Sequence, residues 1–279
     1  MRKHRAGFGM TVLGLLVMAA SAPAATVVTA ASGLNLRTGP GTQYQVIRIL
    51  PHGAAVTVTG SSGIWRKVNA SGTVGWVNGA YLGTTSTASL TSCTSTAHIG
   101  DSLSAYVLPG LRSEYAARGV TRFVGSAYGG RGVLQKVSAD PETGAAAAAR
   151  IRSSGFTGCW VVALGTNDTA NVAAGAWYTR GYAIDRMMKA VDPNGRARVM
   201  WVNLFTTRST GYWSNNNMKL WNQALTAAQG RWPNLKVYNW AAVAATGVAP
   251  YADGIHHTGA GYVVRNRSIA AALARFFPR

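Results

Sequence analysis

The stretch HIGDSLSAY, residues 98–106, decides how the larger part of this chain is interpreted. A short apolar run ends at Gly100, and an acid and a serine follow it. The chain of 279 residues has only eight acidic residues, so an acid beside Ser102 needs a reason. Two interpretations are open: an ordinary turn from a strand into a helix, or a turn that presents Ser102 as a nucleophile. The second requires partner groups elsewhere in the chain.

Strand and helix patterns alternate through five units from this stretch onward. This alternation predicts an α/β domain with a parallel sheet covered by helices on both faces. A helix is expected over 140–155, with Asp140 as its cap and Pro141 at its first position. The other helices are expected over residues 110–118, 177–192, 214–232 and 259–277, and the strands over residues 96–100, 121–127, 159–165, 197–205 and 234–240.

Ligands of such sheets bind beyond the carboxyl ends of the strands, and polar groups of several kinds follow these strands. They are Gly100-Asp101-Ser102, the glycine-rich VGSAYGGRG, GTND at 165–168, and YADGIHHTG at 251–259. A serine hydroxyl needs a base, and an imidazole held by a carboxylate is suited to that task. Asp253 and His256, three residues apart on one loop, are suited to these two roles. Backbone amides and the Asn167 carboxamide would stabilise an oxyanion.

These four blocks, in this order, resemble the SGNH (GDSL-type) hydrolase superfamily, whose catalytic domain is a three-layer, flavodoxin-like α/β fold. The resemblance implies Ser102 as nucleophile, with Asp253 and His256 completing the triad. It places Ser102, Gly130 and Asn167 in the oxyanion hole, and Gly129 remains an alternative to Gly130. A proline commonly follows the catalytic histidine, whereas this chain has His257, which we expect to pack or to contact solvent. Asp101 is expected to shape the turn.

Residues 26–82 have a different pattern, with short alternating runs separated by glycine and proline turns. LNLRTGPG, VIRILPHGAAVTV and GTVGWVNGAYL resemble the bacterial SH3-like domain, a small β-barrel. The resemblance implies binding of cell-wall glycan or peptidoglycan; a spacer without a ligand is the alternative. The aromatic residues of this segment could line a groove, but core positions are the more common case: Tyr44, Trp65, Trp76 and Tyr81. Residues 83–95 are predicted as a Ser/Thr-rich linker, so the hydrolase domain is expected over 96–279.

Residues 1–25 have a positive start, an apolar stretch and an Ala-Pro-Ala site, which predicts a cleaved signal peptide and a secreted or wall-associated protein. No later segment has the length and apolarity to span a bilayer. Loss of Arg2, Lys3 and Arg5 leaves 24 basic against eight acidic residues, a formal charge of +16. This charge favours polyanionic partners. Nucleic acid is not expected, because the basic residues are scattered and no nucleic-acid-binding signature is present.

Cys93 and Cys159 lie nine residues before Ser102 and eight before Asn167, respectively. If the two strands are sheet neighbours, both cysteines lie near the opposite sheet edge in similar register. We therefore predict a disulfide between them, with two buried free thiols as the alternative. No metal or other cofactor is expected, since no cluster of ligating residues is visible.

The predicted function is a secreted serine esterase that cleaves acyl esters, O-acetyl above all, on wall glycan or another polysaccharide. An O-acyltransferase with the same triad is the first alternative, and a non-catalytic wall-binding protein is the second. Tyr212 and Trp213 follow a strand in a loop and are candidates for sugar stacking. The acyl chain and the glycan cannot be identified from the sequence.

Overall fold

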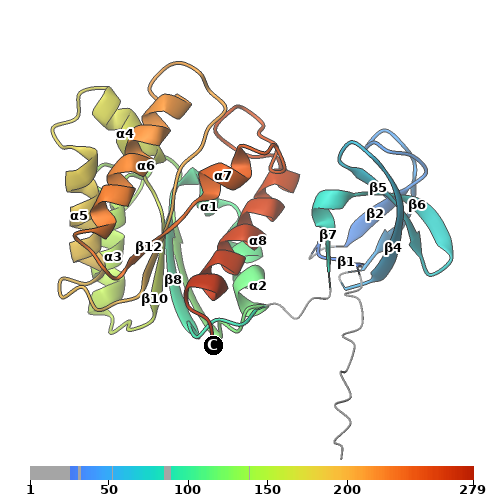
Figure 1. Ribbon diagram of the computed structural model, residues 1–279, viewed down its shortest axis with the longest axis horizontal. Helices are drawn as coiled ribbons and strands as arrows, with labels where there is room; N and C mark the ends of the chain where they lie inside the picture. Colours follow the sequence, from blue (N-terminus) through green and yellow to red (C-terminus); the bar gives the residue numbers. More distant parts are fainter. Residues whose placement is uncertain (1–25, 31–32, 52, 85–88, 138) are drawn as a thin grey trace, which may run out of the picture.

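The computed structural model describes residues 26–30, 33–51, 53–84, 89–137 and 139–279. The predicted signal peptide, residues 1–25, lies outside the described residues, as does part of the predicted linker, residues 85–88. The chain forms an antiparallel β unit followed by a larger α/β unit (Figure 1).

Five parallel strands form the sheet of the α/β unit, in the order β12-β11-β10-β8-β9. The central strand β10 is buried along its whole length, as its apolar sequence CWVVA predicts. The chain extends from β8 to β9 on one side and then to β10 on the other. The order in which strands are added to the sheet therefore reverses between β8 and β10. Ligands of such sheets bind at this point. The strands are β8 (Ser95–Gly100), β9 (Arg122–Ala127), β10 (Cys159–Ala163), β11 (Val199–Val202) and β12 (Leu235–Tyr238).

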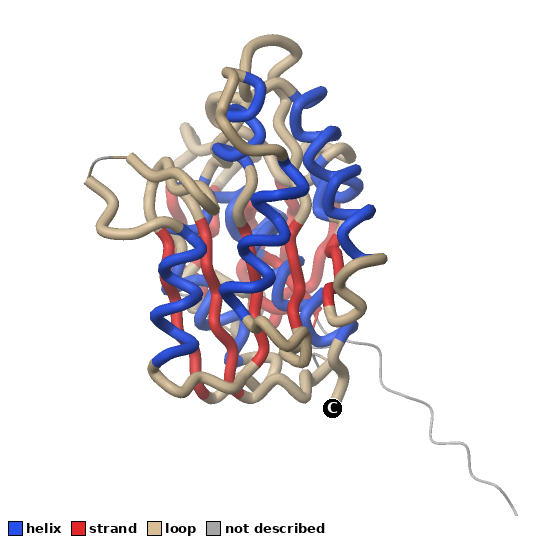
Figure 2. The backbone as a smooth tube through the Cα atoms, turned by 90° about the vertical axis from the view of Figure 1, so that its left-hand side faces the viewer, coloured by secondary structure: helices blue, strands red, loops and turns tan. Residues whose placement is uncertain are grey.

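Helices cover both faces of this sheet and bury two separate apolar clusters (Figures 1 and 2). One face carries α3 (Gly144–Ser153), α5 (Arg180–Val191) and α6 (Asn215–Gln229), which pack on Trp160 and Trp201. The other face carries α2 (Leu108–Ala116), α7 (Trp240–Ala244) and α8 (Gly259–Phe276). The predicted three-layer α/β fold is confirmed.

The start of α3 differs from the expectation that Asp140 caps this helix. The helix begins at Gly144, and Thr143 is its cap, accepting a hydrogen bond from the Ala146 N–H at 3.2 Å. Asp140 instead binds the guanidinium of Arg131 through both carboxylate oxygens, each at 2.8 Å. Arg131 is 2% exposed, and a buried guanidinium needs a charged partner more than a helix needs one of two possible caps.

The N-terminal unit is an antiparallel sheet in the order β3-β2-β6-β5-β4-β1-β7, in which adjacent strands are hydrogen-bonded. Its core is aliphatic, with Val28, Leu36 and Val68 fully covered. Of the four aromatic residues, Tyr81 packs half-buried against this core, whereas Tyr44 is exposed. Trp65 and Trp76 are half-buried outside the core cluster, so the expected core position holds in part for Tyr81 alone. The strands are β1 (Thr26–Val28), β2 (Leu34–Arg37), β3 (Val46–Leu50), β4 (Ala55–Ser62), β5 (Trp65–Ala70), β6 (Thr73–Asn78) and β7 (Leu82–Thr84), with the short 3-10 helix η1 (Gly79–Tyr81) before β7.

Arg267 on α8 joins the two units. Its Nη1 donates to the Leu82 carbonyl at 2.9 Å, and its Nη2 donates to the Thr29 hydroxyl. Glu114 on α2 lies 3.8 Å from Arg267 Nε. The β unit thus rests against α8, on the side of the sheet opposite α3 and α5 (Figure 1).

The ends of the predicted linker are part of the folded units. Residues 83 and 84 belong to β7, and Ser95 begins β8. Thr91 forms a β-bridge with Pro278. Cys93 and Cys159 form the predicted disulfide, which attaches this segment to the amino end of β10.

Candidate active site

The turn after β8 positions Ser102 at the first residue of the short helix α1 (Ser102–Ala105). Asp101 caps this helix: its Oδ1 accepts the Leu103 N–H at 2.9 Å. A side chain at Gly100 would place its Cβ 2.5 Å from Ser104, so only glycine fits the end of the strand. Asp101 shapes the turn, as expected, and is 1% exposed. Burial raises the pKa of Asp101, against the Leu103 hydrogen bond and the charge of Arg265.

His256 and Asp253 lie on the loop before α8, and the imidazole reaches Ser102. Ser102 Oγ is 2.9 Å from His256 Nε2, and His256 Nδ1 is 2.7 Å from Asp253 Oδ2. A carboxylate at this distance holds the ring proton on Nδ1, which leaves Nε2 free to accept from the serine hydroxyl. Ser102 and His256 are separated by 154 residues in the chain.

Asp253 is fixed by the loop that bears it. Its Oδ1 accepts the N–H groups of Ile255 at 2.8 Å and His256 at 2.6 Å. Partial burial acts to raise the pKa of Asp253, but the hydrogen bonds from His256 and Ile255 hold it below its ordinary value. The Asp253 and His256 side chains are 47% and 40% exposed, so this part of the site is open to large substrates.

Asn167 occupies the first turn of α4 (Thr166–Ala173), directly after β10. Its Nδ2 donates to the Arg131 carbonyl at 3.1 Å, and its Oδ1 accepts from the Trp213 indole N–H at 3.4 Å. These two contacts fix which way the carboxamide points. Trp213, predicted as a sugar-stacking residue, therefore contacts the Asn167 side chain, whereas Tyr212 beside it is exposed.

The glycine-rich loop after β9 contains both glycines considered for an oxyanion amide. Gly130 has a φ of +75°, and a Cβ there would lie 2.5 Å from Val137. Gly129 has open space at the corresponding position. Of the two positions, Gly130 is therefore the one where the backbone requires glycine, and it directly precedes the buried Arg131.

His257 is buried among Trp240, Tyr251 and Tyr262. Burial and the charge of Arg265 lower the pKa of His257 to about 4, against backbone groups of Pro250 and Ala249. His257 therefore packs as a neutral ring, and His256 alone of the two reaches Ser102.

Two buried charged residues near the site were not assigned a role from the sequence. Arg265 on α8 donates to the Leu103 carbonyl at 2.9 Å, directly behind the Ser102 turn. Asp168 accepts the Val133 N–H at 2.8 Å and so joins α4 to the glycine-rich loop. Asp168 was visible as part of GTND, whereas Arg265 lies in a helix pattern that gave no sign of its burial.

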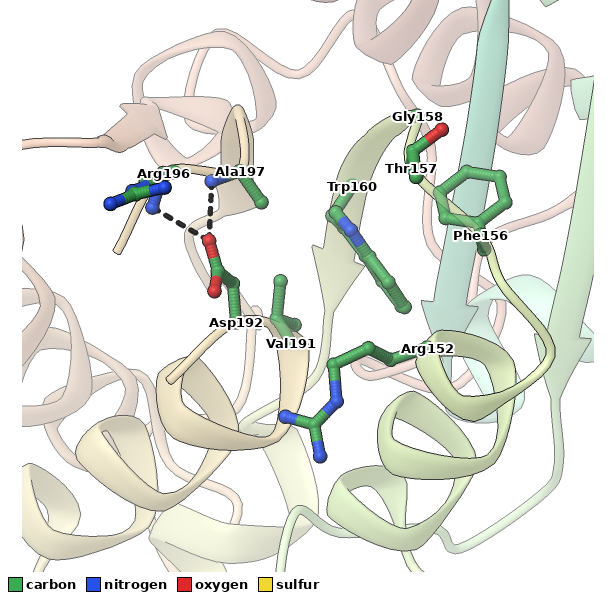
Figure 3. A pocket seen from close by; sticks show the side chains of 9 residues that line it. All are labelled: Arg152, Phe156, Thr157, Gly158, Trp160, Val191, Asp192, Arg196 and Ala197. Carbon is green, nitrogen blue, oxygen red and sulfur yellow. Dashed lines mark hydrogen bonds between the residues drawn. The ribbon is translucent and has the colours of Figure 1, made fainter. Parts of the chain in front are cut away.

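The described residues also bear on two other kinds of site, a metal site and a membrane span. No group of three or more His, Cys, Asp or Glu side chains in this part of the chain is placed to hold a metal ion. Of the helices that the structure describes, none combines the length and apolarity needed to cross a bilayer. Figure 3 shows a separate pocket, at the amino ends of β10 and β11 and away from Ser102.

Residues 32–83 match the family model of the bacterial SH3 domain, so this segment is a bacterial SH3 domain. No curated protein matches the sequence. Among solved structures, the chain is similar to the lipase/acylhydrolase from Enterococcus faecalis, with 16% identity over 66% of this chain and 98% of that chain and a TM-score of 0.52. This likeness shows that the α/β unit has the SGNH (GDSL-type) hydrolase fold.

Two further solved structures align with the same share of this chain, 66%. The carbohydrate acetylesterase Est24 from Sinorhizobium meliloti is 15% identical over 99% of its chain, with a TM-score of 0.49. The C-terminal catalytic domain of the Streptococcus pneumoniae peptidoglycan O-acetyltransferase A is 14% identical over 96% of its chain, with a TM-score of 0.48.

Proposed function

We propose that this protein is a secreted serine esterase that removes acyl groups, O-acetyl above all, from cell-wall glycan or a related polysaccharide. The observation that carries the proposal is the continuous hydrogen-bonded series from Ser102 through His256 to Asp253. It lies at the carboxyl ends of β8 and β10, where the order of strand addition reverses, which is the usual ligand position of this fold class.

In the proposed reaction, Ser102 Oγ attacks the ester carbonyl carbon and its proton passes to His256 Nε2. Asp253 stabilises the imidazolium that forms. His256 then returns the proton to the leaving sugar oxygen, the C–O bond breaks, and an acetyl-Ser102 ester remains. Water attacks this ester with His256 as base, which releases acetate and restores the serine.

The negative charge on the tetrahedral oxygen needs donors that are already in position. The Ser102 N–H lies at a helix start, Asn167 Nδ2 is fixed by its two contacts, and the Gly130 N–H would be the third donor. Such fixed dipoles stabilise developing charge without having to reorganise during the reaction.

The polymer substrate is supported by the open site and by the domain beside it. The exposed Asp253 and His256 leave room for a chain that extends past the ester. The bacterial SH3 domain would bind the wall and keep the esterase near its substrate. A sugar hydroxyl could replace water in the second step, in which case the same residues would transfer the acetyl group.

The test measures acetate released from O-acetylated peptidoglycan and from a soluble acetyl ester. Ser102→Ala is the catalytic variant, and Ser113→Ala on the exposed side of α2 is a matched control. We expect wild type and Ser113→Ala to release acetate from both substrates and Ser102→Ala from neither. Full turnover by Ser102→Ala would contradict the assignment, and acetyl transfer to an added chitooligosaccharide without release would favour the transferase.

A further inference from the structure

The eight acidic residues of this protein are either buried or in contact with backbone N–H groups or basic side chains of the same chain. Asp101 and Asp168 are buried, and the Asp192 carboxylate accepts the backbone N–H groups of Asn194, Arg196 and Ala197. The other five face arginine or histidine side chains: Glu114, Asp140, Glu142, Asp185 and Asp253. Residues 26–84 contain no acid at all. The large positive charge is therefore carried by surface lysines and arginines that have no carboxylate assigned to them.

Part of this charge borders a trough between two helices. α3 and α5 pack side by side. α3 is rich in alanine, so its side chains project only a short distance from the helix. A hollow of about 430 Å³ lies along this surface, and Arg186 and Lys189 of α5 form its other wall. Both basic side chains are exposed.

A second hollow, of about 310 Å³, continues from the ends of the same helices (Figure 3). Arg152, from α3, and Arg196 line it. Arg152 Nη1 donates to the Lys189 carbonyl at 3.0 Å, so the two hollows share this junction. We call the two hollows together the α3–α5 groove, with four cations: Arg152, Arg186, Lys189 and Arg196.

One acid, Asp192, also lines the second hollow, and it must be weighed against these cations. Partial burial acts to raise its pKa, but the N–H groups of Asn194, Ala197 and Arg196 lower it, so Asp192 stays ionised. Its oxygens are already occupied by backbone donors, as Figure 3 shows for Arg196 and Ala197. Four cations to one acid leave the groove strongly positive.

The second hollow of the groove, which Arg152 and Arg196 line, is remote from the candidate active site. The second hollow lies at the amino ends of β10 and β11, whereas Ser102 and Asn167 follow the carboxyl ends of their strands. α3 and α5 cover the sheet face opposite α8 and the SH3 domain (Figure 1). A ligand held in this hollow would therefore leave Ser102 and the SH3 domain free.

We propose that the α3–α5 groove binds a linear phosphodiester polymer of simple polyols, as a second attachment point besides the SH3 domain. Guanidinium groups match phosphate oxygens in charge and in geometry, and a row of them suits a repeating anion. The aromatic rings at the groove offer no stacking face, since Phe156 is 5% and Trp160 1% exposed. A polymer with bases would find no platform there, so the groove favours a chain without them.

The test compares two variants that each remove three positive charges. The groove variant is Arg186→Gln, Lys189→Gln, Arg196→Gln; the control is Lys67→Gln, Lys219→Gln, Lys236→Gln. All six side chains are exposed, and equal thermal unfolding would show that both variants fold. Binding to fluorescent poly(glycerol phosphate) is measured over a range of salt concentrations.

We expect the groove variant to bind at least about tenfold more weakly than wild type, with a salt slope reduced by about two to three. The control should stay within about threefold, and hydrolysis of a soluble ester should be unchanged in both. Equal losses in the two variants, or no binding by wild type at low salt, would overturn the proposal.

Two further probes decide the class of polymer. Single-stranded poly(dT) tests a nucleic acid, and phosphatidylglycerol vesicles test an anionic membrane surface. We expect poly(glycerol phosphate) to bind most tightly and to depend most on the groove. Tighter, groove-dependent binding of poly(dT) or of the vesicles would contradict the assigned ligand.

Discussion

Asn167 is the residue whose surroundings say most about how an oxyanion would be stabilised. Its carboxamide contacts the Arg131 carbonyl on one side and the Trp213 indole on the other. An amide held in this way cannot exchange its nitrogen and oxygen positions without losing both contacts. Its N–H groups are therefore preorganised, which is where such donors gain their catalytic effect.

We predict that Asn167→Ala lowers kcat for a soluble acetyl ester by roughly 10²–10³, with little change in KM, because the lost donor acts on the transition state. Trp213→Phe keeps an aromatic ring but removes the indole N–H, so it should give a smaller loss in kcat. Steady-state kinetics of both variants check this. A change confined to KM in Asn167→Ala would instead indicate a substrate-binding residue.

Residue types at strand ends were enough to predict Ser102, Asp253, His256 and Asn167 as site residues. The contact of Trp213 with Asn167 could not be predicted, because it depends on how a loop after β11 folds back over α4. The burial of Arg265 was equally hidden, since an arginine in an amphipathic helix usually faces solvent.

At the scale of elements, Asp168 ties α4 to the glycine-rich loop from a buried position. Burial raises the pKa of Asp168 from 3.8 to about 7, although the Val133 and Leu134 N–H groups oppose this. Between these two values the folded state holds a proton that the unfolded state has lost. The contribution of Asp168 to stability therefore falls as the pH rises through this window.

Asparagine cannot ionise, so Asp168→Asn removes this pH dependence. The variant should therefore gain stability relative to wild type as the pH rises from about 4.5 to about 7.5. The control is Asp192→Asn, because the pKa of Asp192 is lowered and its pH dependence lies below this window. Melting temperatures across the pH range provide the measurement. A constant difference between Asp168→Asn and wild type would show that Asp168 is ionised throughout.

The disulfide links the segment before β8 to the start of β10 and closes a loop of 66 residues. Replacing both cysteines by serine should lower the free energy of unfolding by about 4 kcal/mol on the chain-entropy model. Urea denaturation measures this difference, with reduced wild type as a second reference. A change of well under about 1 kcal/mol would mean that packing alone holds these elements together.

Elements with a strong pattern were predictable, and their ends were not. The sequence identified α3 but assigned its cap to Asp140, and only the position of Arg131 determines that Asp140 is used elsewhere. Similarly, no helix was expected over 166–173, because GTND has a typical turn composition, although the chain forms α4 there.

At the scale of the whole molecule, the SH3 domain is attached to α8, the helix that directly follows His256. Arg267 makes this attachment through the Leu82 carbonyl and the Thr29 hydroxyl. Arg267→Ala should increase the rate of proteinase K cleavage within residues 83–95 by several-fold and leave soluble-ester hydrolysis unchanged. Lys219→Ala is the control, and equal cleavage rates in the two variants would show that Arg267 does not hold the domains together.

Two units of different class were predictable from the change of pattern near residue 83. Their contact was not, because Arg267 carries no signal in the sequence that separates it from the other arginines of the last helix.

The most direct test of Ser102 as an activated nucleophile is peptide mass spectrometry after reaction with an alkyl phosphonate ester, which forms a stable adduct with such a serine. We expect one adduct, on Ser102, formed together with complete loss of ester hydrolysis and strongly slowed in His256→Ala. Complete inactivation with the adduct on another residue, or unchanged labelling of Ser102 in His256→Ala, would contradict it.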